Sequence, residues 1–345
     1  MTLEAQTIKP ATLASPAKAE ASYGHEAPRH DRPAWWKALG LPLFALAALL
    51  LHLAVAQAEP AAETRSYSIF LGGIAVAGLA VFGLQFKVTA LRRWIFEKGP
   101  ILSAGIAIMA ALEAATTGLR LLPLPYFPSP ARVLQSIIDD RAMLWTSTWH
   151  SLFLLLSGYL LGVLIGLISG VCIGWFARAR YWGMPILKLI GPIPATAWIP
   201  LALVLSPSAL FSAIGLIALA VWFPVTMLTS SGISNTRASY LDVAKTLGSS
   251  RSFLIFRVAV PAAMPNIFLG LFMGLGTAFL TVVVAETVGV KSGLGWYLGW
   301  AKEWAEYGKV YSSLVVMAVF FSTIMTALFK VRDRVLVWQK GTIKW

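Results

Sequence analysis

The chain has 345 residues, of which 58% are hydrophobic and 12% charged, and its mean hydropathy is +0.73. These values lie outside the range of soluble globular domains and indicate a membrane protein with several spans. The net charge of +13 would fit nucleic-acid binding only with a basic soluble domain, and the sequence shows none. The single cysteine, Cys172, excludes an intrachain disulfide and a cysteine-based metal cluster, so we interpret it as a packing residue.

Residues 1–37 are rich in Ala, Pro, Thr and charged residues and lack hydrophobic periodicity, which predicts a disordered tail. The apolar run that follows ends in the small-residue sequence 54–58 (AVAQA), which is typical of a signal-peptide cleavage site. We favour an uncleaved helix, because so long a polar tail is unusual before a signal peptide. N-terminal sequencing of the mature protein would decide between the two.

A membrane-spanning helix needs about 20 apolar residues. Eight runs meet this requirement and predict an all-α bundle: 39–56, 69–86, 101–121, 148–176, 186–205, 209–230, 262–285 and 310–329. Between the third and fourth runs, a proline-rich connection at 122–130 precedes an amphipathic stretch at 131–144. After the seventh run, Trp296, Trp300 and Trp304 recur on one helical face, as either an interfacial aromatic belt or a docking surface.

The distribution of basic residues predicts the orientation of these spans. If the N-terminus is cytoplasmic, 21 of the 28 lysines and arginines fall on the inside and seven on the outside. Positive charge is enriched in cytoplasmic loops of membrane proteins. We therefore expect an inner-membrane protein with both termini in the cytoplasm.

The segment 240–265 (YLDVAKTLGSSRSFLIFRVAVPAAMP) is polar and helix-forming, although it lies between two strongly apolar runs. Leu241, Ala244 and Leu247 form a small apolar stripe, and Gly248 permits the left-handed conformation that ends a helix. Ser249 or Ser250 can cap a second helix, on which we expect Phe253, Phe256 and Val260 to share one face before Pro261 and Pro265 begin the next span. The result is a helical hairpin on the cytoplasmic surface, suited either to a groove on a soluble partner or to packing on its own bundle.

Ionisable residues inside spans are costly and are candidates for function. Four occur here: His52, Glu113, His150 and Glu286. We interpret His52 as a packing residue and His150 as solvated, and Glu113 could pair with another helix. Glu286 is the strongest candidate for a gate or substrate contact, and its alternative is a structural ion pair or helix-end hydrogen bond.

The fifth run is interrupted by Gly191, Pro192, Pro194 and Pro200. Broken helices at membrane depth are tolerated where they line a cavity or lie within protein, which places Thr196 and Trp198 beside a translocation pathway. Gly270, Gly274 and Gly276 in the seventh run suit close helix packing across a dimer. The sequence contains no phosphate-binding loop of the form GxxxxGK[ST] and no metal-ligand spacing, so we expect no catalytic site in this chain.

The hairpin resembles the signature of membrane subunits of type I ABC importers, which runs E-A-A, three residues, G, nine residues, I, one residue, L-P. Asp242, Val243, Ala244, Gly248 and Pro261 fall at the required positions, with Val258 and Val260 at the two intervening ones. The resemblance covers 122–345 and is closest to the nitrate, taurine and alkanesulfonate permease group, whose patterns match 192–194, 197–201, 284–286 and 292–295. The stretch 205–208 (LSPS) departs from that group, which weakens any statement about the substrate.

The resemblance implies a MetI-like core of six spans within 99–345, preceded by two extra N-terminal spans within 38–98. It implies a permease that works as a dimer, with two cytoplasmic ATPases that bind ATP and Mg²⁺ and an external substrate-binding protein. The segment 240–261 would then be the coupling helix. Leu241, Asp242, Val243, Ala244, Leu247, Gly248 and Pro261 would contact or position the ATPase.

Two other classes remain open at this point. An ion-driven secondary transporter would need intramembrane carboxylates, of which Glu113 and Glu286 are available. A channel or scaffold would use the hairpin for docking alone. The substrate implied by the resemblance is a small anion such as nitrate, taurine or an alkanesulfonate.

Overall fold

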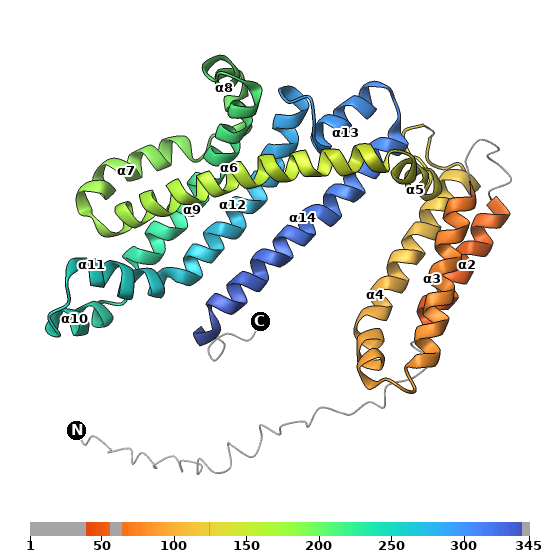
Figure 1. The fold of residues 1–345 in the computed structure, drawn as a ribbon, viewed down its shortest axis with the longest axis horizontal. Helices are drawn as coiled ribbons and strands as arrows, with labels where there is room; N and C mark the ends of the chain where they lie inside the picture. The colour runs from red at the N-terminus through yellow and green to blue at the C-terminus, as the bar shows by residue number, and fades with distance from the viewer. Residues whose placement is uncertain (1–38, 56–63, 124, 340–345) are drawn as a thin grey trace, which may run out of the picture.

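The computed structural model describes residues 39–55, 64–123 and 125–339, and these residues form helices and connecting turns without a β-strand (Figure 1). Six helices are long and apolar enough to cross a membrane: 65–84, 91–118, 141–175, 209–234, 251–288 and 307–335. A seventh candidate is a pair of helices bent by 86° at a short break. The predicted all-α membrane fold is confirmed, but the eight continuous spans are not.

Helices α2 (Gly40–Val55), α3 (Thr64–Leu84) and α4 (Thr89–Glu113) form an N-terminal unit at one side of the molecule (Figure 1). Apolar side chains of α2, α3, α4 and α5 (Pro130–Asp139) make up its core. Helix α2 has only 16 residues and is about 24 Å long, whereas the hydrocarbon core of a bilayer is about 30 Å thick. The prediction of two extra full-length N-terminal spans is therefore not supported at α2, while α3 is long enough to span.

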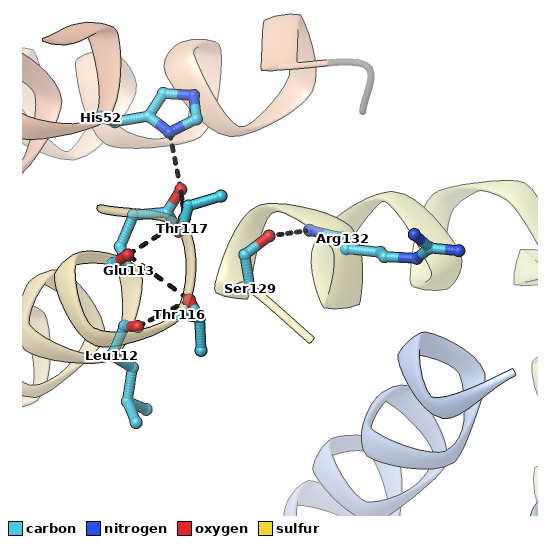
Figure 2. A network of polar contacts seen from close by, with 7 residues as sticks. All are labelled: His52, Leu112, Glu113, Thr116, Thr117, Ser129 and Arg132. Atoms are coloured by element: carbon cyan, nitrogen blue, oxygen red, sulfur yellow. Dashed lines mark hydrogen bonds and ion pairs between the residues drawn. The ribbon is translucent and has the colours of Figure 1, made fainter. Parts of the chain in front are cut away.

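A polar pair fastens α2 to α4 inside this unit, as Figure 2 shows. Nδ1 of His52 lies 3.1 Å from Oε1 of Glu113, and both side chains are buried. The Thr117 hydroxyl donates to the Glu113 backbone carbonyl at 3.0 Å, within a turn of π-helix, η3 (Ala114–Gly118), that extends α4. His52 is thus buried between helices, and Glu113 pairs with another helix, as the sequence suggested.

The centre of the molecule consists of α6 (Arg141–Trp175), α9 (Ala209–Ser234) and α12 (Val260–Val288). Helix α9 lies between the other two and packs extensively on both. Two glycines of α12, Gly270 and Gly274, contact α9 of the same chain, while a Cβ on Gly276 would meet open space. The predicted use of these glycines across a dimer interface is therefore corrected for Gly270 and Gly274, which serve packing within one chain.

The contact between α6 and α9 rests on five glycines at every fourth position: Gly158, Gly162, Gly166, Gly170 and Gly174. Each faces a β-branched residue of α9, and these are also four apart: Ile217, Val221, Val225, Thr229 and Ile233. A Cβ on any of the five glycines would lie 2.6 to 2.9 Å from the Cβ of its partner, which is closer than real side chains approach. The two helices therefore touch backbone to side chain along five successive turns, in the manner of small-residue packing in membranes.

The remaining helices complete the two ends of the bundle. Helix α13 (Leu294–Glu303) lies beside α5 at one end, and α10 (Ala238–Thr246) and α11 (Arg251–Phe253) lie at the opposite end (Figure 1). Helix α14 (Tyr307–Val335) returns along the bundle and is little buried. The short η6 (Val337–Gln339) follows it.

Candidate functional site

The hairpin predicted from 240–265 is present, and its turn has the predicted glycine. After α10, the Gly248 N–H donates to the Lys245 carbonyl at 2.9 Å, and the Ser249 N–H donates to the Ala244 carbonyl at 3.1 Å. These two bonds form a Schellman motif, which requires a left-handed residue, and Gly248 has φ of +76°. The hydroxyl of Ser250 then accepts from the Phe253 N–H at 3.3 Å and caps the second helix.

The exposure of α10 differs from the predicted apolar stripe. Ala244 is buried and Leu241 half-buried, whereas Leu247 is 80% exposed. Leu247 is the C-cap residue with ψ of 9°, so its side chain leaves the helical track. Val243 is 61% exposed on the same hairpin, and Asp242 forms an exposed ion pair with Lys245 at 3.1 Å. The apolar surface available to a partner is therefore made by Val243 and Leu247, and Ala244 is enclosed within the chain, where α10 packs on η5.

The second helix is not separate from the following span. Helix α11 continues through a π-helical segment, η5 (Leu254–Ala259), directly into α12. Pro261 has no N–H to donate to the carbonyl of Arg257, which favours a locally wider turn at this point. The wider turn shifts the buried face to Leu254, Ile255 and Ala259.

The predicted face of Phe253, Phe256 and Val260 is consequently wrong. Phe253 and Phe256 point to the exterior, and Val260 is half-buried. The α-helical period of 3.6 residues used in the prediction does not hold through a π-turn.

The interruption predicted in the fifth run is the bend between α7 (Ala177–Ile190) and the pair η4 (Ala195–Trp198) and α8 (Ile199–Leu205). A cavity of about 350 Å³ lies beside it, between η4, α9 and α12. Thr196 lines this cavity, together with two threonines of α12, Thr277 and Thr281, that the sequence interpretation missed. Their hydroxyls donate to backbone carbonyls of Gly274 and Thr277.

Trp198 does not contribute to this cavity among the lining residues that are described. It is half-buried, and its indole N–H is enclosed without a hydrogen-bond acceptor. The predicted pathway position is therefore consistent with Thr196 alone of the pair. The wall of the cavity is apolar apart from the three threonines, since Phe223, Pro224, Met273 and Leu280 make up much of it.

Glu286 also lies away from this cavity. It is 1% exposed and accepts hydrogen bonds from the Ser151 hydroxyl and the Gly295 N–H, both at 2.7 Å. This is the helix-end hydrogen-bonding role that stood as its alternative. His150 is exposed and bonds only within its own helix, to the carbonyl of Thr146 at 2.8 Å.

Three sequence signals were not used in the interpretation. The five-glycine repeat of α6 is visible in the sequence, but its β-branched partners lie more than 50 residues away. Ser151, the partner of Glu286, is 135 residues away and belongs to no local pattern. The half-buried Trp296 and Trp300 pack around Tyr297 and Leu294, while Trp304 is exposed, so these tryptophans do not form one outward face.

Comparison with known proteins follows the same region of the chain. Residues 162–336 match the family of binding-protein-dependent transport system inner membrane components. A probable ABC transporter permease protein of Haemophilus influenzae is 34% identical over 166 residues, which are 48% of this chain and 67% of that protein. The taurine transport system permease protein TauC of Escherichia coli is 28% identical over 183 residues, 51% of this chain and 66% of that protein.

A putative aliphatic sulfonates transport permease protein, SsuC of Bacillus subtilis, is 29% identical over 185 residues, 53% of this chain and 66% of its own. The chain thus spans about two thirds of the length of these relatives. A solved chain of the MetNI methionine ABC transporter in an inward facing conformation shares the fold, with a TM-score of 0.50 and 18% identity, and covers 57% of this chain and 98% of its own. Since the family model matches half of its residues, the chain belongs to the inner-membrane permease components of binding-protein-dependent ABC transport.

Proposed function

We propose that two copies of this chain form the translocation pathway of an ATP-driven importer, and that each copy is coupled to a cytoplasmic ATPase through 240–261. The main support is the hairpin. It presents Val243 and Leu247 to the exterior on a turn held by two backbone hydrogen bonds, and isolated exposed leucine on so ordered a surface turn suits a docking contact. Leu241, Asp242, Ala244, Gly248 and Pro261 then position this surface and are not its apolar contacts.

In this scheme the ATPases bind ATP and Mg²⁺, and this chain has no catalytic role of its own. An external binding protein delivers the substrate, and the hairpin lies on the cytoplasmic side together with both termini. The residues 99–345 form the importer domain, 38–98 add the N-terminal helices, and 1–37 precede them.

The substrate class that we propose is a small anion. The support comes from relatives named for taurine, aliphatic sulfonates and bicarbonate, because all three solutes are small and anionic. The described lining of the cavity beside Thr196 contains no lysine or arginine. We therefore assign recognition of the anion's charge to the binding protein, with the permease passing the solute along an apolar and hydroxyl-lined route.

The coupling role is tested by replacing Leu247 with Asp. Because the side chain is 80% exposed, the change should leave insertion and thermal stability intact, and it should reduce co-purification of the ATPase and uptake of taurine, bicarbonate or an alkanesulfonate. Val337→Asp is the matched control, since Val337 is an exposed apolar residue in η6, outside the hairpin. Unchanged ATPase association in the Leu247→Asp protein would contradict the proposal.

A further inference from the structure

Helix α13 is fastened at its N-terminus by a buried carboxylate from α12. Oε1 of Glu286 accepts from the Ser151 hydroxyl of α6 at 2.7 Å, and Oε2 accepts from the Gly295 N–H at 2.7 Å. The Ser151 oxygen also accepts from the Leu294 N–H at 2.8 Å. Two N–H groups that would otherwise be unpaired at the start of α13 are thus satisfied by side chains from two other helices.

The turn before α13 has room for this carboxylate because two of its residues are glycines. Gly293 has φ of +112°, and a Cβ on it would collide with the Glu286 carboxylate. A Cβ on Gly295 would collide with the carbonyl oxygen of Val283. The sequence 292–295, Ser-Gly-Leu-Gly, is therefore shaped around Glu286, and the two features belong to one device.

A second polar cluster holds the middle and far end of α13. The Tyr297 hydroxyl donates to Asp140, the residue between α5 and α6, at 2.7 Å. Lys309, in the first turn of α14, lies 3.3 Å from Asp140 and 2.8 Å from Glu306. Burial, together with the hydrogen bond to Asp140, raises the pKa of Tyr297 above its usual range, so the hydroxyl remains a donor. Helix α13 is thereby joined to α5, α6, α12 and α14 and cannot shift independently of them.

The same α12 reaches the hairpin at the other end of the bundle (Figure 1). Residues Arg251–Val288 form one helix of 38 residues, about 57 Å long. The hairpin turn precedes its first residue, and Glu286 lies near its last. A rigid element of this kind carries a displacement from one end to the other.

We propose that Glu286 and Ser151 are positioning residues that lock α13 to α12 and α6, so that movement of the hairpin is delivered to the opposite face of the transporter through α13. This inference rests on the proposed function, because it takes the hairpin to be the point where the ATPase acts. Neither residue needs to contact the solute. Their role is to keep the two ends of the permease in register while the ATPases close and open.

The test uses hydrogen–deuterium exchange on the full-length permease with its ATPase in lipid nanodiscs, with and without ATP and vanadate. In the unmodified protein, vanadate trapping should change exchange at both 240–261 and 294–303. In Glu286→Ala and Ser151→Ala, the hairpin should still respond, while the response of 294–303 falls about fivefold or more. Glu286→Gln should retain the response, because an amide can accept from Gly295 and donate to Ser151.

Ser313→Ala is the matched control, since the Ser313 hydroxyl is buried but bonds only within α14. Ser151→Ala removes a single oxygen and keeps the test valid if Glu286→Ala does not insert. A normal response of 294–303 in Ser151→Ala, or a hairpin response without any α13 response in the unmodified protein, would overturn the inference. Failure of the ATPase to bind the unmodified permease would instead refute the proposed function.

Discussion

Gly248 offers a test in which backbone conformation can be separated from side-chain contact. Its φ is +76°, and a Cβ at this position would meet no heavy atom within 4 Å. The cost of replacing Gly248 is therefore conformational: about 1–2 kcal/mol for alanine in the left-handed region, more for a β-branched residue, and less for asparagine. The two hydrogen bonds of the Schellman turn depend on that conformation.

If the ATPase recognises the ordered hairpin, this cost appears as lost affinity. We expect Gly248→Ala to weaken ATPase binding about fivefold to thirtyfold, Gly248→Val to weaken it further, and Gly248→Asn to bind nearly as well as the natural protein. Thermal stability of the bundle should change little, because the turn is exposed. The assay is titration of nanodisc-embedded permease with the purified ATPase. Equal losses for Asn and Val would show a steric role for Gly248, and equal retention would show that its conformation is not needed; either result refutes the reasoning.

Two further predictions concern the stability of the bundle. Gly162→Ala should lower the free energy of unfolding by about 1–3 kcal/mol because its new Cβ would lie 2.7 Å from that of Val221, while Gly276→Ala, which meets open space, should be neutral or stabilising. Thermal unfolding in one fixed detergent compares the pair, and equal shifts would contradict the glycine-repeat explanation. His52→Leu should cost about 1–3 kcal/mol, because it leaves an oxygen of Glu113 without the His52 partner, whereas the exposed His150→Leu should change stability by less than about 0.5 kcal/mol. A loss in the His150 protein as large as in the His52 protein would show that burial of the pair does not matter.

The hairpin could be predicted well because its signals are local. A glycine that ends one helix and a serine that caps the next act within four residues of themselves, and Gly248 and Ser250 do so here. The buried face of the second helix could not be predicted in the same way. Its register depends on the π-turn before Pro261, which a period of 3.6 residues does not describe.

The role of Glu286 depends on residues distant in the chain. A carboxylate near the end of an apolar run could line a pathway or cap a helix, and the sequence supports both. Only the approach of Ser151 from α6 and the turn at Gly293 and Gly295 separates them. The short α2 presents a similar case, since a polar pair with Glu113 holds it in place where length alone predicted a full span.

The packing of α6 against α9 also bears on how such a permease could change shape. Each glycine notch of α6 receives a β-branched side chain, and such side chains are stiff at χ1. Sliding one helix past the other would push five side chains out of their notches at once, so small continuous displacements are costly. Because α12 packs on α9 through Gly270 and Gly274, all three helices move together. The deformable place in the described chain is therefore the 86° bend between α7 and α8, which borders the cavity at Thr196. Opening and closing of the pathway is then expected as movement of this bent segment against a rigid three-helix body, with the hairpin at one end of that body and α13 at the other.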